Sequence, residues 1–157
     1  MAARSRVLLI TICVAGLAGC KATPPGRLET RAVALAKHHI FIGNKKQKNP
    51  LPYTPENWKD GQEAFSHYCV SCHGMDGQST GVPFAGNISP PIPSLASSEV
   101  QSYSDGQLKW ILDYGISPSG MPGSKGTLSD DELWAIIVFL RHLPPARSQG
   151  VPELYTR

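Results

Sequence analysis

The sequence lacks any apolar stretch long enough to cross a lipid bilayer as a helix. The longest apolar run, residues 7–20, is 14 positions long, whereas a membrane-spanning helix needs roughly 20. A permanent transmembrane helix is therefore the weaker interpretation. Arg4 and Arg6 precede the run, and a charged start followed by a short apolar stretch is typical of a secretory signal. We therefore expect residues 1–19 to be a signal peptide and the chain to be exported.

Cysteine is scarce, which excludes a disulfide-rich scaffold. The chain has four cysteines, and Cys13 lies within the predicted signal. The residues before Cys20, Leu-Ala-Gly, resemble the lipobox of bacterial lipoproteins. That resemblance implies cleavage before Cys20, acylation of Cys20 and a membrane-anchored protein that faces the periplasm. An ordinary signal peptide that happens to contain a cysteine is the alternative.

The other two cysteines belong to the run CVSCH at residues 69–73. Two cysteines separated by two residues, with a histidine directly after the second, form the attachment pattern of c-type haem. Each sulfur can add to one haem vinyl group, and His73 can supply the proximal nitrogen to the iron. The sequence therefore predicts one covalent haem c, bound through Cys69 and Cys72.

Other readings of the CVSCH run fit less well. A structural zinc site needs four ligands, and only His67 and His73 could join the two cysteines, on a single crowded turn. A thioredoxin-like redox pair expects a surrounding βαβ pattern, and none is visible. A disulfide between the two cysteines would leave His73 unexplained.

Strand patterns are also missing, and the periodicity is helical, so we predict an all-α fold with loop-rich connections. The first helix begins near Thr54-Pro55 and runs into the CVSCH run. Two more helices open on capping-box spacings, at Ser104 and at Ser129, and the last one stops before Pro144. The segment between residues 73 and 97 is rich in Gly, Pro and Ser, which predicts a loop. The apolar stripes that we expect to be buried are Leu108, Ile111 and Leu112 on one helix, and Leu133, Ile136, Ile137 and Leu140 on the next.

These patterns divide the exported chain into three parts. Residues 20–54 form a lipid-anchored basic linker with a possible short helix over residues 28–42. Residues 55–144 form a helical haem domain, and residues 145–157 form a C-terminal tail without clear periodicity.

Charge is distributed unevenly along the chain. Residues 21–59 hold eight Lys or Arg and two Asp or Glu, a net charge of +6, whereas residues 60–157 hold five and ten, a net charge of −5. One hypothesis is that Lys45, Lys46 and Lys48 rest against anionic lipid headgroups, each adding about 1 kcal/mol of attraction. A solvated linker is the alternative.

An electron carrier usually fills both axial positions of its iron, so a second ligand is expected. The candidates are Met75, Met121, His67, His142, and His38 or His39. Met75 and His67 lie too close to His73 in sequence to reach the opposite haem face. His142 lies on a helix that is expected to pack, and we interpret it as a surface residue. Met121 lies in a Gly- and Pro-rich loop between two helices that can wrap the far face, so it is the predicted ligand.

Together, the CVSCH run, the Gly-Met-Pro loop at residues 120–122 and the flanking helices resemble a class I cytochrome c domain over residues 55–144. The resemblance implies that a proline carbonyl in the loop at residues 90–93 accepts a hydrogen bond from His73. Pro91 and Pro93 both fit, and we favour Pro93. It also implies that Tyr103 and Trp110 lie in the haem surroundings, with plain core packing as the alternative for both.

The resemblance further implies one-electron transfer by a membrane-tethered protein rather than enzymatic turnover. Its redox partners would be a quinol-oxidising complex, a terminal oxidase or a dehydrogenase, and it would bind no nucleic acid. Two alternatives stay open: a permanent haem subunit of a larger oxidoreductase, and a ligand-binding haem sensor or enzyme.

Overall fold

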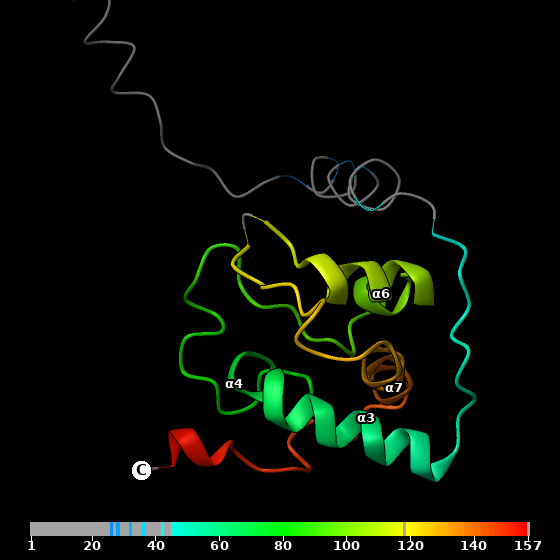
Figure 1. The fold of residues 1–157 in the computed structure, drawn as a ribbon. Coiled ribbons are helices and arrows are strands. Elements are labelled where there is room, and N and C mark those ends of the chain that lie inside the picture. Colours follow the sequence, from blue (N-terminus) through cyan, green and yellow to red (C-terminus); the bar gives the residue numbers. More distant parts are fainter. Residues whose placement is uncertain are drawn as a thin grey trace, which may run out of the picture. The chain divides into compact units, whose positions relative to one another are not determined.

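The structure is a computed structural model that describes residues 45–117 and 119–156, together with Gly26, Leu28, Ala32, Ala36 and Ile42. The helices of the described chain are α3 (Pro55–Tyr68), α4 (Val70–His73), α5 (Ser98–Gln101), α6 (Asp105–Tyr114), α7 (Asp130–Arg141) and the 3-10 helix η2 (Glu153–Tyr155). Figure 1 shows their arrangement, with long loops between α4 and α5 and between α6 and α7. The described residues form no strand, only isolated bridges such as Ile116 with Met121. The predicted all-α fold is thus confirmed.

The helices begin where the sequence predicts. The Thr54 side chain accepts a hydrogen bond from the Asn57 amide at the start of α3, and proline occupies the first helical position. Ser104 and Ser129 form complete capping boxes at α6 and α7. A capping box pairs two helix-end donors that otherwise have no partner. These short-range signals therefore predict where the helices start.

The main contact of the fold is the crossing of α3 and α7 (Figure 1). Gly61 makes it possible, because a Cβ at this position would lie 2.0 Å from the Ala135 carbonyl oxygen. Phe65 of α3 packs against Phe139 of α7, with ring centroids 5.0 Å apart. α7 is buried on nearly all sides, since every residue from position 133 to 140 is buried. The crossing therefore holds α3, and with it the CVSCH run that follows, against the core.

Ion pairs join α6 to both ends of α7. Lys109 lies 2.7 Å from Asp113 on α6 and 2.9 Å from Asp130 at the start of α7. Arg141 at the end of α7 lies 2.8 Å from Asp105 at the start of α6. Lys109 is buried, so removal of its partners would leave a costly unpaired charge. The predicted stripes of both helices are buried.

The segment before α3 packs on the helices. Ile42 is buried in the core, and Leu51 packs against the same core. The Asn49 side-chain amide donates to the Trp134 backbone carbonyl over 2.9 Å. Lys45, Lys46 and Lys48 remain exposed. The basic side chains of residues 45–48 thus project from backbone that lies against the domain.

Some expectations differ from the structure or fall outside it. The short helix α5 does not follow from the periodicity, because it has only four residues. Helix α7 ends at Arg141, three residues before Pro144. Most of the possible helix at residues 28–42, and all of the signal segment, lie outside the described residues. Within the described part of the chain, no helix has the length and apolar character needed to span a membrane.

Candidate functional site

The CVSCH run forms one helical turn directly after α3. Cys69 ends α3 and caps the start of α4. Its carbonyl accepts hydrogen bonds from the amides of Cys72, over 3.1 Å, and of His73, over 2.9 Å. Residues three and four apart share one face of a helical turn. Cys69, Cys72 and His73 are therefore held on the same side of α4, as attachment to one planar group requires.

His73 is the most informative side chain of this turn. Its ring lies beside Phe65, with centroids 6.4 Å apart. Burial lowers the pKa of His73 to about 4, so the ring is neutral at physiological pH. Its Nδ1 atom is buried and has no hydrogen-bond partner in the described part of the chain. A neutral imidazole is the form that binds metals, so the site suits an iron ligand.

The two cysteine thiols fit the same interpretation. Both are partly buried, and they do not form a disulfide with each other. Burial raises the pKa of Cys69 to about 12, and the neighbouring Cys72 adds to the effect. Cys69 is therefore a protonated thiol that packs against the core. Among the described residues, no three His, Cys, Asp or Glu side chains are grouped to hold a bare metal ion.

The loop after His73 folds back onto α4. Gly74 has a φ of +70°, and a Cβ there would lie 2.8 Å from the Thr80 amide nitrogen. The Ser79 amide donates to the His73 carbonyl over 2.7 Å. A glycine at residue 74 is therefore required both by the left-handed backbone and by the close approach of the loop.

Asp76, which we did not select from the sequence, organises this loop. It is fully buried, and its carboxylate accepts hydrogen bonds from the Gln78 amide, the Thr80 hydroxyl and the Arg147 amide over 2.9, 2.6 and 2.7 Å. Burial alone would raise the pKa of Asp76, but the hydrogen bonds from Thr80, Arg147 and Gln78 outweigh it and hold the pKa below its ordinary value. A charged carboxylate therefore joins the loop to the C-terminal tail.

Met121 lies in a loop that backbone hydrogen bonds hold against the end of α6. The Ile116 amide donates to the Met121 carbonyl over 3.0 Å, and the Ser124 amide donates to the Leu112 carbonyl over 2.8 Å. Gly115 has a φ of +71°, and a Cβ there would lie 2.3 Å from the Met121 carbonyl oxygen. The Met121 side chain is half-buried and packs against the core cluster that Cys69 also contacts. The backbone around Met121 is thus fixed from both sides.

Apolar side chains from separate segments accompany Cys69 and Met121 around the core. The half-buried members include Leu95, Trp110 and Ile116. Trp110 packs on Tyr114 with ring centroids 5.4 Å apart, and Tyr103 is buried within the core. Burial raises the pKa of Tyr103, with a further contribution from Glu99. Tyr103 and Trp110 therefore have the apolar setting expected of haem neighbours, and their role stays a prediction.

Pro93 does not bond to His73 in the described residues. Pro93 is exposed, and the His73 Nδ1 atom has no partner there. The predicted hydrogen bond between them stays a prediction for the haem-bound protein.

The other candidate ligands from the sequence lie elsewhere. The His67 and His142 side chains are exposed, and each bonds the backbone carbonyl of the residue four positions earlier, Glu63 and Val138. His38 and His39 lie outside the described residues.

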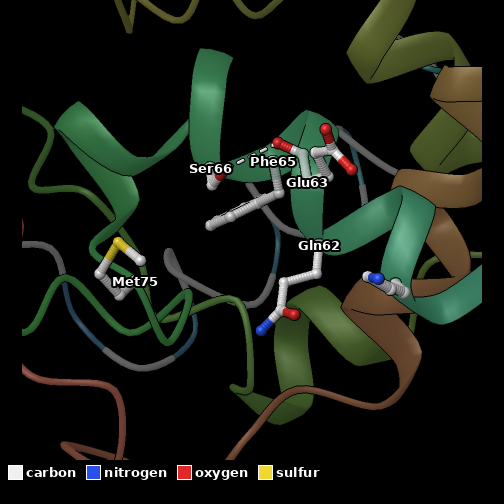
Figure 2. Close-up of a pocket in the computed structure, with 6 residues that line it drawn as sticks. Gln62, Glu63, Phe65, Ser66 and Met75 are labelled. Carbon is white, nitrogen blue, oxygen red and sulfur yellow. Dashed lines mark hydrogen bonds between the residues drawn. The ribbon is translucent and has the colours of Figure 1, made fainter.

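Met75 lines a separate pocket of about 360 Å³ beside α3. Figure 2 shows that Gln62, Glu63, Phe65 and Ser66 reach this pocket from α3, whereas Met75 comes from the loop after α4. Met75 and Met121 thus occupy different surroundings, and only Met121 packs against the core cluster of Cys69.

One comparison with known proteins bears on this site. The sequence profile of the family described as "Cytochrome C oxidase, cbb3-type, subunit III" matches residues 56–140. The chain belongs to this family. The matched region covers all but the first residue of α3, the CVSCH turn, α6 and all but the last residue of α7. The domain is therefore a c-type cytochrome, and its cofactor is covalently bound haem c.

The residues of the structure fit this cofactor. His73 follows two thiols on one turn. Burial lowers the pKa of its ring, and its buried Nδ1 atom has no hydrogen-bond partner among the described residues. Apolar side chains from α6 and its loop lie against the same core that Cys69 contacts. Cys69 and Cys72 would hold the haem covalently. His73 and Met121 stay the predicted ligands of its iron.

Proposed function

We propose that the chain transfers single electrons through a haem c linked to Cys69 and Cys72, with His73 and Met121 as the axial ligands. The observation that carries this proposal is the single turn that presents both thiols together with the His73 ring. The Nδ1 atom of that ring is buried and has no hydrogen-bond partner among the described residues. When bound, the haem supplies an iron that alternates between ferric and ferrous states. Thioether and imidazole ligation favours the ferrous state and raises the reduction potential.

The protein holds both proposed ligand residues in constrained backbone. His73 sits on a turn that is anchored through α3 to the core, and Met121 sits in a loop tied to the end of α6. Ligands that stay in place in both oxidation states need little rearrangement, which keeps the barrier to electron transfer low. This arrangement supports electron transfer better than binding and turnover of an external ligand.

Replacing Met121 tests the axial ligation, and Met75 provides the matched control. We expect Met121→Ala to change the optical spectra of both oxidised and reduced protein and to lower the reduction potential, because a soft sulfur ligand to Fe(II) is lost. Met75→Ala removes a methionine from a different pocket and should leave both properties close to those of the wild type. If Met121→Ala leaves the spectra unchanged, Met121 is not a ligand, and a ligand-binding sensor or enzyme becomes the better proposal.

We further propose that the mature chain begins at an acylated Cys20 and is tethered to a membrane on its periplasmic side. The sequence Leu-Ala-Gly-Cys at residues 17–20 supports this, and so does the exposed basic group Lys45, Lys46 and Lys48 at the edge of the domain. The basic group would add electrostatic attraction to anionic headgroups.

Cys20→Ser tests the tether. We expect the variant to lose its lipid and to leave the membrane fraction, because basic residues alone bind a bilayer only weakly. Mass spectrometry of the mature protein and fractionation with and without detergent measure this. A wild-type N-terminus that is unmodified, or that is cut elsewhere, would contradict the anchor.

A second candidate function is a permanent haem subunit of a larger oxidoreductase, which the description of the matched family favours. The partners of a free carrier would instead be a quinol-oxidising complex, a terminal oxidase or a dehydrogenase. Extraction of native membranes with a mild detergent, followed by size analysis, separates the two. A haem that elutes with a large complex indicates a subunit, and a haem that elutes at the size of this chain indicates a carrier.

A further inference from the structure

The C-terminal tail, residues 144–156, lies beyond the part of the chain that the family profile matches, residues 56–140. It nevertheless folds back onto the haem-attachment segment. In Figure 1 the tail runs from the end of α7 past α3 and α4 and ends in η2. The tail therefore lies outside the matched region but makes specific contacts with it.

Tyr155 makes the contact nearest to the haem cysteines. Its hydroxyl donates to the carbonyl of Ser71 over 2.7 Å, and Ser71 lies between Cys69 and Cys72 in the attachment turn. The Tyr155 ring also meets Phe84 edge-on, with centroids 6.3 Å apart and planes at 77°. One side chain of the tail thus touches both the attachment turn and the loop that follows it.

The hydrogen bond from Tyr155 gives the Ser71 carbonyl a partner. The carbonyls at the end of a helix lack partners within the helix, and α4 has only four residues. The Val70 carbonyl accepts from the Gly74 amide over 2.9 Å, and the His73 carbonyl accepts from the Ser79 amide over 2.7 Å. The Ser71 carbonyl points to the tail and accepts from Tyr155. The tail therefore supplies a partner that the turn and its own loop do not provide.

Other contacts hold the tail in place along its length. The Arg147 backbone amide donates to the buried Asp76 carboxylate over 2.7 Å, and the Gln78 side-chain amide donates to the Pro144 carbonyl over 3.3 Å. Val151 packs so closely on Gly81 that a Cβ there would lie 2.5 Å from a Val151 methyl carbon. Pro152, directly before η2, is fully buried. These contacts hold the tail against the domain, so Tyr155 lies beside Ser71 in a constrained segment.

We propose that this tail is a strap that positions the haem-attachment turn for electron transfer, and that Tyr155 is its positioning residue. The inference rests on the proposed function, since the turn matters for electron transfer only where it carries the haem and His73. The strap immobilises the backbone that holds both thioether positions and the proximal ligand. A firmer turn lowers the rearrangement that accompanies each change of oxidation state, and a lower barrier gives a faster rate.

Tyr155→Phe tests the strap in the full-length haem-bound protein. It keeps the ring against Phe84 and removes only the hydroxyl. We expect hydrogen exchange of the amides of Cys72, His73 and Gly74 to quicken about fivefold, the population change that follows the loss of one ordinary hydrogen bond. The rate of electron self-exchange, measured by NMR in mixtures of oxidised and reduced protein, should fall by a similar factor.

Tyr53→Phe is the matched control. Tyr53 is exposed and stacks on His142 at a centroid distance of 4.1 Å, so the same chemical change is made away from the attachment turn. This variant should exchange amides and electrons at the wild-type rates.

The outcomes separate the strap from the proposed function. Wild-type amide exchange in Tyr155→Phe would overturn the strap. Faster amide exchange with an unchanged rate of electron self-exchange would also overturn it, because the tail would then support the fold without affecting the redox step. A wild-type protein that carries no covalent haem would instead contradict the proposed function itself.

Discussion

Replacing both Cys69 and Cys72 by serine should give a polypeptide that loses all of its haem on denaturation and washing in acid acetone, whereas the wild-type chain stays red. Thioether bonds need sulfur, and a serine hydroxyl does not replace it in this linkage. Both thiols lie on one turn with His73, so each single variant should keep one covalent link. A denaturing gel stained for haem, from a host that matures c-type cytochromes, measures the result.

Cys20→Ser is the control for this experiment, because it removes a cysteine that lies outside the haem domain. It should retain the haem fully and stay as red as the wild type after washing. Haem that remains bound to the double variant, or that is washed from the wild type, would show that Cys69 and Cys72 do not attach it. The axial assignments to His73 and Met121 would then lose their basis as well.

The local part of the fold follows from the sequence because its signals act over a few residues. The capping boxes at Ser104 and Ser129 and the proline at the start of α3 place three helices correctly. The CVSCH run predicts the haem site because covalent attachment requires that spacing on one turn. These features do not depend on which segments meet in space.

Other features depend on contacts between distant segments, and the sequence does not show them. Asp76 is separated from Arg147 by 71 positions, and Tyr155 is separated from Ser71 by 84. The apolar residues of the tail show no regular spacing, because single residues such as Pro152, and not one face of a helix or strand, make its contacts. The turn at Asp76 has a weak local signal, because an Asp side chain often bonds the backbone amide two residues later. The link from Asp76 to the tail has no local signal.

The sequence predicts the end of α7 only approximately. Pro144 predicts a stop, and the helix does stop, but three residues earlier, at Arg141. Arg141 bonds Asp105 and the carbonyl of Gln101, over 2.8 and 2.9 Å. The start of α6 therefore meets α7 at its last residue. Local sequence signals therefore place the C-terminus of α7 only approximately, and the contacts of Arg141 with α6 accompany its exact position.

Gly61→Ala should destabilise the domain strongly. A Cβ at residue 61 would lie 2.0 Å from the carbonyl oxygen of Ala135 and 2.5 Å from its carbonyl carbon. Both are backbone atoms, so no side chain can rotate away, and α3 and α7 must separate. Overpacking of this kind costs roughly 3 kcal/mol, more than the gain of about 1 kcal/mol that alanine brings to a helix over glycine. We expect the midpoint of thermal unfolding to fall by more than about 10 °C.

Gly86→Ala provides the contrast for this last prediction. A Cβ at Gly86 would have no heavy atom within 4 Å, so this substitution should change the free energy of unfolding by less than about 1 kcal/mol. Thermal unfolding of the haem-bound proteins, followed by circular dichroism, compares the two. Equal midpoints for Gly61→Ala and the wild type would mean that α3 and α7 do not cross at residue 61. Because α3 ends at Tyr68, directly before the first haem cysteine, loss of the crossing at residue 61 would also remove support from the attachment turn.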